Sequence, residues 1–257
     1  MKTFPYVGVT GFMSRHEVDR VLEVFPGNLG RKLMIGILIS SKILRGIPVR
    51  LPNRYPNPGD IGEIFSQDPK ALNLLHFHAG MEDPERLLDQ LLEITDLGGN
   101  NLHGLQLNMK WPDRDVLTRY RERHPSKVLV LQCGSGALQS AGNDPRSFAR
   151  MVSDYVDVCE YVLIDPSGGK GIPLTPEVAI DYLDHLHDRL DESMKYGVAG
   201  GLGIPGKTTN LLREIFEIFP NTSVDVEGNI RDQPGDNLNP ERACEYVREV
   251  SRLCYAG

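Results

Sequence analysis

The chain has 257 residues, of which 40% are hydrophobic and 25% are charged, and its formal net charge is −7. These proportions are typical of a globular protein with one large core, and the charge argues against a nucleic-acid-binding surface, which needs clustered Lys and Arg. Four cysteines without Cys-x-x-Cys spacing, no signal-peptide pattern and no apolar run of bilayer length predict a reduced, cytoplasmic protein without a membrane partner.

The first half of the chain alternates short apolar runs with helical patterns. Strands are expected at Tyr6–Thr10, Leu33–Ile39, Ala71–His78 and Leu105–Leu107. Helices are expected from the capping box of Ser14 and Glu17 to about Phe25, at Asp60–Ser66, after Asp83-Pro84, and at Asp113–Arg123. The segment 47–59 is rich in Pro, Asn and Arg, which predicts a long irregular loop.

The second half repeats the same alternation. Strands are expected at Val128–Gln132, Tyr161–Ile164, Tyr196–Ala199 and Ser223–Val226, with helices after Asp144-Pro145 and Thr175-Pro176 and at Thr208–Phe219 and Asn239–Leu253. Eight strand–helix units in a chain of this length favour a single (β/α)₈ barrel over 1–257 rather than an open doubly wound sheet. No Ser/Gly-rich linker divides the chain into domains.

Glycines follow the last two expected strands. Gly200 and Gly201 come after the seventh strand, and Asp225, Gly228 and Asn229 lie at the end of the eighth. Such glycines let backbone N–H groups approach an anion, and these two loops form the usual phosphate site of a barrel of this type. We therefore expect a phosphorylated small-molecule ligand there; the alternative is that the glycines only form tight turns.

The segment Gly201–Thr208 also matches the P-loop pattern of nucleotide-binding proteins. Pro205 removes a backbone donor from the loop, and fewer than 50 residues follow Thr208, too few for the usual nucleotide-binding sheet. We interpret the match as a coincidence.

Several motifs resemble those of phosphoribosylanthranilate isomerases. The similar segments are Asp165–Gly171, Ala199–Leu202, Val224–Gly228, Asn53–Tyr55 and the pair Gln106-Leu107. The resemblance implies a barrel that catalyses an Amadori rearrangement, an aldose-to-ketose isomerisation, without metal or organic cofactor. It also implies that Arg54 meets the anthranilate end of the substrate and that Gln106 lies in the site.

The resemblance further implies that Asp165 is the general acid. The general base of that family is a Cys at the end of the first strand, but Thr10 stands there in this chain. Because a threonine hydroxyl cannot supply a base near neutral pH, a relocated base is needed. The candidates are Cys133, at the end of the fifth strand, and His78, at the end of the third. Cys133 can also be a small buried hydrophobic residue.

Two other functions remain open. One is a barrel that keeps the phosphate site and has lost the reaction, a ligand-binding protein. The other is a metal-dependent hydrolase in which His76 and His78, on one face of a strand, bind a metal with Asp165 and Asp225. Lys170 is a candidate clamp for phosphate or carboxylate, and Arg54 a candidate partner for a ligand carboxylate. We expect no metal and a monomer or homodimer.

Overall fold

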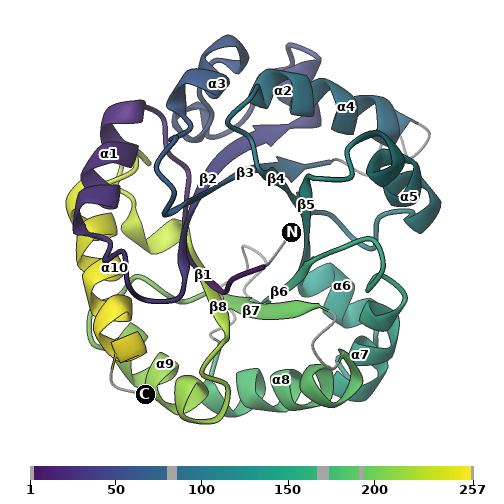
Figure 1. Cartoon of the computed structure of the whole chain (residues 1–257), viewed down its shortest axis with the longest axis vertical. Helices are drawn as coiled ribbons and strands as arrows, with labels where there is room; N and C mark the ends of the chain where they lie inside the picture. The colour runs from purple at the N-terminus through teal and green to yellow at the C-terminus, as the bar shows by residue number, and fades with distance from the viewer. Residues whose placement is uncertain (1–2, 80–85, 167–173, 191–193, 256–257) are drawn as a thin grey trace.

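Eight parallel strands close into a barrel in the computed structural model (Figure 1), in the order β1 to β8 along the chain. The structure describes residues 3–79, 86–166, 174–190 and 194–255. The strands are β1 (Tyr6–Thr10), β2 (Lys32–Ser40), β3 (Ala71–His78), β4 (Gly104–Asn108), β5 (Val128–Gly134), β6 (Tyr161–Asp165), β7 (Lys195–Ala199) and β8 (Ser223–Val226). Val7 of β1 pairs with Val224 of β8, which closes the sheet and confirms the predicted barrel.

Helices surround the barrel and cover the outer face of the sheet (Figure 1). The longer ones are α1 (Arg15–Val24), α4 (Leu87–Gly98), α5 (Arg114–Arg123), α7 (Pro145–Ser153), α8 (Pro176–Leu190), α9 (Lys207–Ile218) and α10 (Pro240–Tyr255). The N-cap Ser14 forms the predicted capping box with Glu17. Within the described residues, no helix combines the length and the apolar character needed to cross a bilayer.

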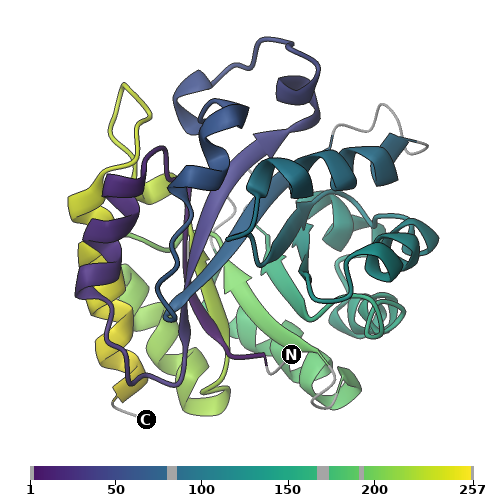
Figure 2. The ribbon, with the colours of Figure 1, turned by 45° about the horizontal axis from the view of Figure 1, so that its top comes forward.

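Several short helices and 3₁₀ turns were not predicted from the sequence. They are α2 (Ser41–Leu44), α6 (Ser135–Ser140) and three 3₁₀ turns, η1 (Pro52–Arg54), η2 (Pro58–Asp60) and η4 (Gly228–Ile230). The helix expected at 60–66 is only α3 (Ile61–Ile64), because Phe65 already has an extended backbone. Helix α2 follows β2 directly, since the Ser40 side chain accepts a hydrogen bond from the Ile43 N–H. Figure 2 shows the segment between β2 and α3 standing above the barrel.

Side chains along the strands alternate between the outer and the inner face of the sheet. The outward ones pack with the helices, as Val9, Ile35 and Leu131 do. The inward ones fill the barrel interior and include Tyr6, Met34, Leu72, Leu74, Val128, Val130, Tyr161, Leu163 and Ala199. This filling is apolar along most of the barrel, apart from Ser223 at the start of β8, and it is polar toward the carboxyl ends of the strands, where the chemistry of such barrels takes place.

Candidate functional site

Four buried polar side chains meet inside the carboxyl end of the barrel. They are Thr10 of β1, Gln106 of β4, Gln132 of β5 and Asp225 of β8, none of which is more than 5% exposed. Thr10 and Gln132 lie an even number of residues from the inward-facing Tyr6 and Val130. Gln106 and Asp225 alternate with outward-facing residues of β4 and β8, so all four side chains point into the barrel. The closed sheet therefore collects polar groups that are far apart in the sequence.

Asp225 is the centre of this group. Its carboxylate accepts hydrogen bonds from Thr10 Oγ1, at 2.9 and 3.1 Å, and from Gln106 Nε2, at 2.9 Å. Thr10 can lie this close because it is paired with Gly36, where a Cβ atom would come within 2.4 Å of the threonine hydroxyl. Asp225, which was expected to contact phosphate or substrate, is thus a buried carboxylate held by two donors.

Burial raises the pKa of Asp225 from its usual acidic range to about 7. The hydrogen bonds from Gln106 and Thr10 act in the opposite direction, and the nearby carboxyl groups of Glu227 and Asp165 add to the increase. An acid with a pKa near 7 exchanges its proton readily at neutral pH, which is the property of an efficient general acid or base.

Two glutamines connect Asp225 with Asp165 across the barrel. Gln106 Nε2 also donates to Gln132 Oε1 at 3.0 Å, and Gln132 Nε2 donates to Asp165 Oδ2 at 3.1 Å. Gln106 is thus brought beside Asp225, and Asp165 lies at the same end of the barrel as Asp225. The arrangement places two carboxylates on one hydrogen-bonded chain of side chains.

The histidines of β3 do not form a metal site with other described residues. His76 is 2% exposed, and its Nε2 lies 3.1 Å from Asn108 Nδ2. Burial, with a smaller contribution from His78, lowers the pKa of His76 to about 4, so the ring is neutral. His78 ends the strand with an exposed side chain. Among the residues that the structure describes, no group of three or more His, Cys, Asp or Glu side chains is placed so that it could hold a metal ion.

Cys133 lies on the wrong face of β5 to act as the relocated base. Its side chain is 1% exposed and belongs to the apolar layer between the sheet and the helices. Burial raises the pKa of its thiol far above the usual range, so the thiolate is strongly disfavoured. The neighbouring Gln132 points into the barrel, and alternation therefore directs Cys133 outward.

Arg54 reaches the mouth of the barrel but is bound by protein carboxylates. Its Nε and Nη2 pair with both oxygens of Asp236, at 2.5 and 2.9 Å, and its Nη1 lies 2.7 Å from Glu227. Asn53 adds a hydrogen bond to the Gly235 carbonyl at 2.8 Å. The guanidinium expected to meet a ligand carboxylate therefore ties the loop after β2 to the loop after β8.

The two glycine loops lie against each other, as the phosphate prediction requires. Asn229 Nδ2 donates to the Leu202 carbonyl at 2.7 Å, which joins the segment after β7 to η4. Gly200 and Gly201 have φ of 92° and 72°, values that favour glycine. This contact uses one of the two hydrogens of the Asn229 side-chain amide. Lys170 lies outside the described residues.

The segment that matches the P-loop pattern is engaged in other contacts. Thr208 is fully buried, and its hydroxyl accepts a hydrogen bond from the Gly203 N–H at 2.9 Å. The Gly206 N–H donates to Glu249 Oε1 at 3.2 Å. The Thr208 hydroxyl and the N–H groups of Gly203 and Gly206 are therefore bonded within the protein, whereas a P-loop directs such groups to nucleotide and metal. This supports the interpretation that the match to the P-loop pattern is a coincidence.

Two charged residues of the mouth were not predicted. Glu227 follows β8 as the N-cap of η4, and its carboxylate lies 2.7 Å from Arg54 Nη1. Burial raises the pKa of Glu227, and Arg231 and Arg54 oppose the increase. The Arg231 side chain is 1% exposed overall, its Nη1 donates to the Asp236 carbonyl at 3.0 Å, and it packs against Gly11. No local pattern indicates that this arginine is buried.

Comparisons with known proteins show the fold and no family. No protein-family model matches the chain, and no curated protein matches it. Among solved structures, active domain 2 of a chitinase from Pyrococcus furiosus matches with a TM-score of 0.58 and 14% identity, over 99% of this chain and 98% of that one. The tryptophan synthase A-subunit from Pyrococcus furiosus matches with a TM-score of 0.53 and 13% identity, over 99% and 100%. A monomeric dihydrodipicolinate synthase variant matches with a TM-score of 0.50 and 14% identity, over 98% and 81%.

Proposed function

We propose that the chain is an enzyme that transfers protons on a small phosphorylated, ribose-derived substrate, in an aldose-to-ketose isomerisation of the phosphoribosylanthranilate isomerase type. The observation that carries this proposal is the buried Asp225, whose pKa of about 7 suits acid–base chemistry at neutral pH. The fold supports it because barrels of this type place catalytic groups at the carboxyl ends of their strands.

In this proposal Asp225 supplies the base that a strand-one cysteine supplies in the resembling family. Thr10, which stands at the cysteine position, donates to both oxygens of Asp225 and so fixes the orientation of the carboxylate. Ionised Asp225 removes the proton from C2 of the substrate. Asp165 protonates the ring oxygen, and the ring C–O bond breaks as the enolamine forms. The enolamine then becomes the ketose: protonated Asp225 gives its proton to C1, and ionised Asp165 accepts the proton of the C2 hydroxyl, so both carboxyl groups return to their starting states.

The phosphate end of the substrate is assigned to the paired loops after β7 and β8. The contact between Asn229 and Leu202 and the positive φ values of Gly200 and Gly201 support this assignment. Backbone N–H groups of these loops and of Gly228 are the donors.

The direct test follows anthranilate fluorescence during turnover of phosphoribosylanthranilate, together with rescue of a tryptophan auxotroph. Asp225→Asn is expected to lower kcat by about 10²- to 10⁴-fold, the usual contribution of a general acid–base group. In the unaltered protein, kcat/KM should rise with pH through a pKa near 7, since the base must be ionised. Asp19→Asn is the matched control, because Asp19 is an exposed carboxylate paired with Arg15 on α1. Absence of turnover and rescue in the unaltered protein would refute the reaction, and full activity in Asp225→Asn would refute the role of Asp225.

A phosphate-ligand-binding barrel without this reaction is the second candidate function. Thr10 favours it, because its hydroxyl is committed to Asp225 and no thiol stands at the end of β1. For this candidate, ribose 5-phosphate raises the melting temperature while phosphoribosylanthranilate is not converted. Failure of ribose 5-phosphate and inorganic phosphate to raise the melting temperature would count against both candidates.

A further inference from the structure

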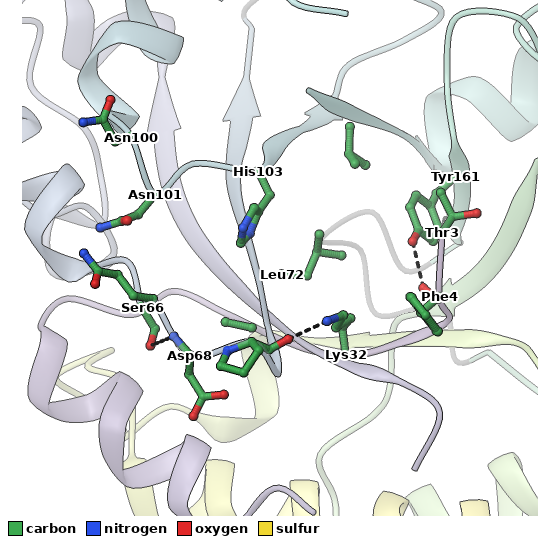
Figure 3. Close-up of a pocket in the computed structure, with 14 residues that line it drawn as sticks. Thr3, Phe4, Lys32, Ser66, Asp68, Leu72, Asn100, Asn101, His103 and Tyr161 are labelled. Atoms are coloured by element: carbon green, nitrogen blue, oxygen red, sulfur yellow. Dashed lines mark hydrogen bonds between the residues drawn. The ribbon is translucent and has the colours of Figure 1, made fainter. Parts of the chain in front are cut away.

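A cavity of about 430 Å³ opens at the amino-terminal end of the barrel, opposite the end that holds Asp225 (Figure 3). Its lining includes Lys32, Ala71, Val128 and Tyr161, the first residues of β2, β3, β5 and β6. This volume falls in the range of small-molecule sites. The proposed catalytic chemistry uses none of these residues, so the cavity needs an explanation of its own.

The inner wall of the cavity is apolar. Leu72, Val128 and Tyr161 are at most 8% exposed and belong to the core inside the barrel. Phe4 lies on the rim, held by a 2.7 Å hydrogen bond from Tyr161 Oη to its carbonyl. Such a wall accepts a flat apolar group by removing its surface from water.

Hydrogen-bond donors surround this wall. His103 Nδ1 accepts the Asn73 N–H at 2.8 Å, so the neutral ring carries its proton on Nε2. The Ser66 hydroxyl accepts from the Asp68 N–H at 3.1 Å, which leaves its own hydrogen to donate. The Lys32 ammonium donates to the Pro69 carbonyl and lies 5.6 Å from the centre of the Phe4 ring. Figure 3 shows His103 and Lys32 on two sides of Leu72.

The local charge is positive although the whole chain is acidic. Burial lowers the pKa of His103, and the positive charges of Lys127 and Lys32 lower it further. Of the described lining residues, Asp68 alone is acidic. Its carboxylate accepts the Lys70 N–H at 2.8 Å and lies 3.7 Å from the Lys70 ammonium, so its charge is already balanced. Donors together with unbalanced positive charge favour an anion.

We infer that this cavity is a second ligand site, which binds a small carboxylate anion with a planar apolar body. The carboxylate lies between Lys32 and His103, and the planar body lies on Leu72, Val128 and Tyr161. The site is separate from the proposed active site and does not depend on the proposed reaction.

The test uses benzoate as the probe and measures its dissociation constant by ligand-observed NMR titration. Benzamide has the same shape without the charge, and benzylamine reverses the charge. Lys32→Met is expected to weaken benzoate binding about tenfold, because it removes a charged hydrogen-bond donor from the carboxylate. Lys195→Met is the matched control, since Lys195 begins β7 at the same end of the barrel and does not line the cavity.

A second variant keeps the inference testable if Lys32→Met does not fold. Leu72→Phe keeps the wall apolar and extends a ring over the proposed position of the planar body, so it should strongly weaken benzoate binding while the protein keeps its circular dichroism spectrum. Saturable benzoate binding that is weakened by Lys32→Met and Leu72→Phe, and that is not displaced by ribose 5-phosphate, is the expected result. Absence of saturable binding, equal affinity for benzamide, or unchanged affinity in both variants would overturn the inference.

Discussion

Replacing Asp225 with Asn should make the stability of the protein less sensitive to pH. The folded protein holds this carboxyl group with a pKa of about 7, against an ordinary value of 3.8. A carboxyl group with a raised pKa binds more protons in the folded state than in the unfolded state. Its contribution to stability is therefore lost as the pH rises from the unfolded pKa toward the folded one. Asparagine does not titrate and can accept the hydrogen bond from Thr10.

The expected size follows from the pKa difference. From about pH 5 to about pH 7 the unfolded group is ionised while the folded group stays protonated, and each pH unit costs about 1.4 kcal/mol. Over this window Asp225 removes about 3 kcal/mol from the free energy of unfolding. For a chain of this length, that corresponds to roughly 5–10 °C in melting temperature.

The assay compares melting temperatures of the unaltered protein and Asp225→Asn at about pH 5 and about pH 8. The melting temperature of Asp225→Asn minus that of the unaltered protein should be roughly 5–10 °C larger at about pH 8 than at about pH 5. The contributions of all other groups cancel in this difference. Asp19→Asn should show no such gain, since Asp19 is exposed. A difference that stays constant with pH would show that folded Asp225 is already ionised at pH 5 and would refute the reasoning.

Two further substitutions test how the mouth is built. Gly11→Ala should lower the free energy of unfolding by about 3 kcal/mol or more, because Gly11 has φ of 108° and a Cβ there would come within 1.8 Å of Arg231 Nη2. Urea titration measures both free energies of unfolding. Gly30→Ala, at φ of 66° with open space around it, should lower the free energy of unfolding by only about 1 kcal/mol. Equal losses in the two variants would contradict the close contact between Gly11 and Arg231. Arg54→Ala should cost about 1–2 kcal/mol and increase proteolysis of the loop after β8, because the variant loses the paired contact with Asp236. Unchanged proteolysis would show that this contact does not hold the loop.

The order of elements was accessible from the sequence because it rests on local signals. The capping box at Ser14 and Glu17 and the apolar runs of β1 and β3 identify elements whose observed bounds match closely. The short helices α2 and α6 were missed, since each begins directly where a strand ends and has too few residues for a helical pattern.

The sequence by itself determined that eight strand–helix units follow one another and that Asp165, Asp225 and the glycine loops lie at strand ends. Only the closed barrel decided which side chains meet there. Asp225 receives its hydrogen bond from Thr10 across 215 positions of the chain, and burial at that point raises its pKa to about 7. Likewise, only tertiary packing turned Cys133 outward and engaged Arg54 with Asp236. The physical reason is that desolvation and long-range pairing depend on the closed sheet, whereas propensity and periodicity are local.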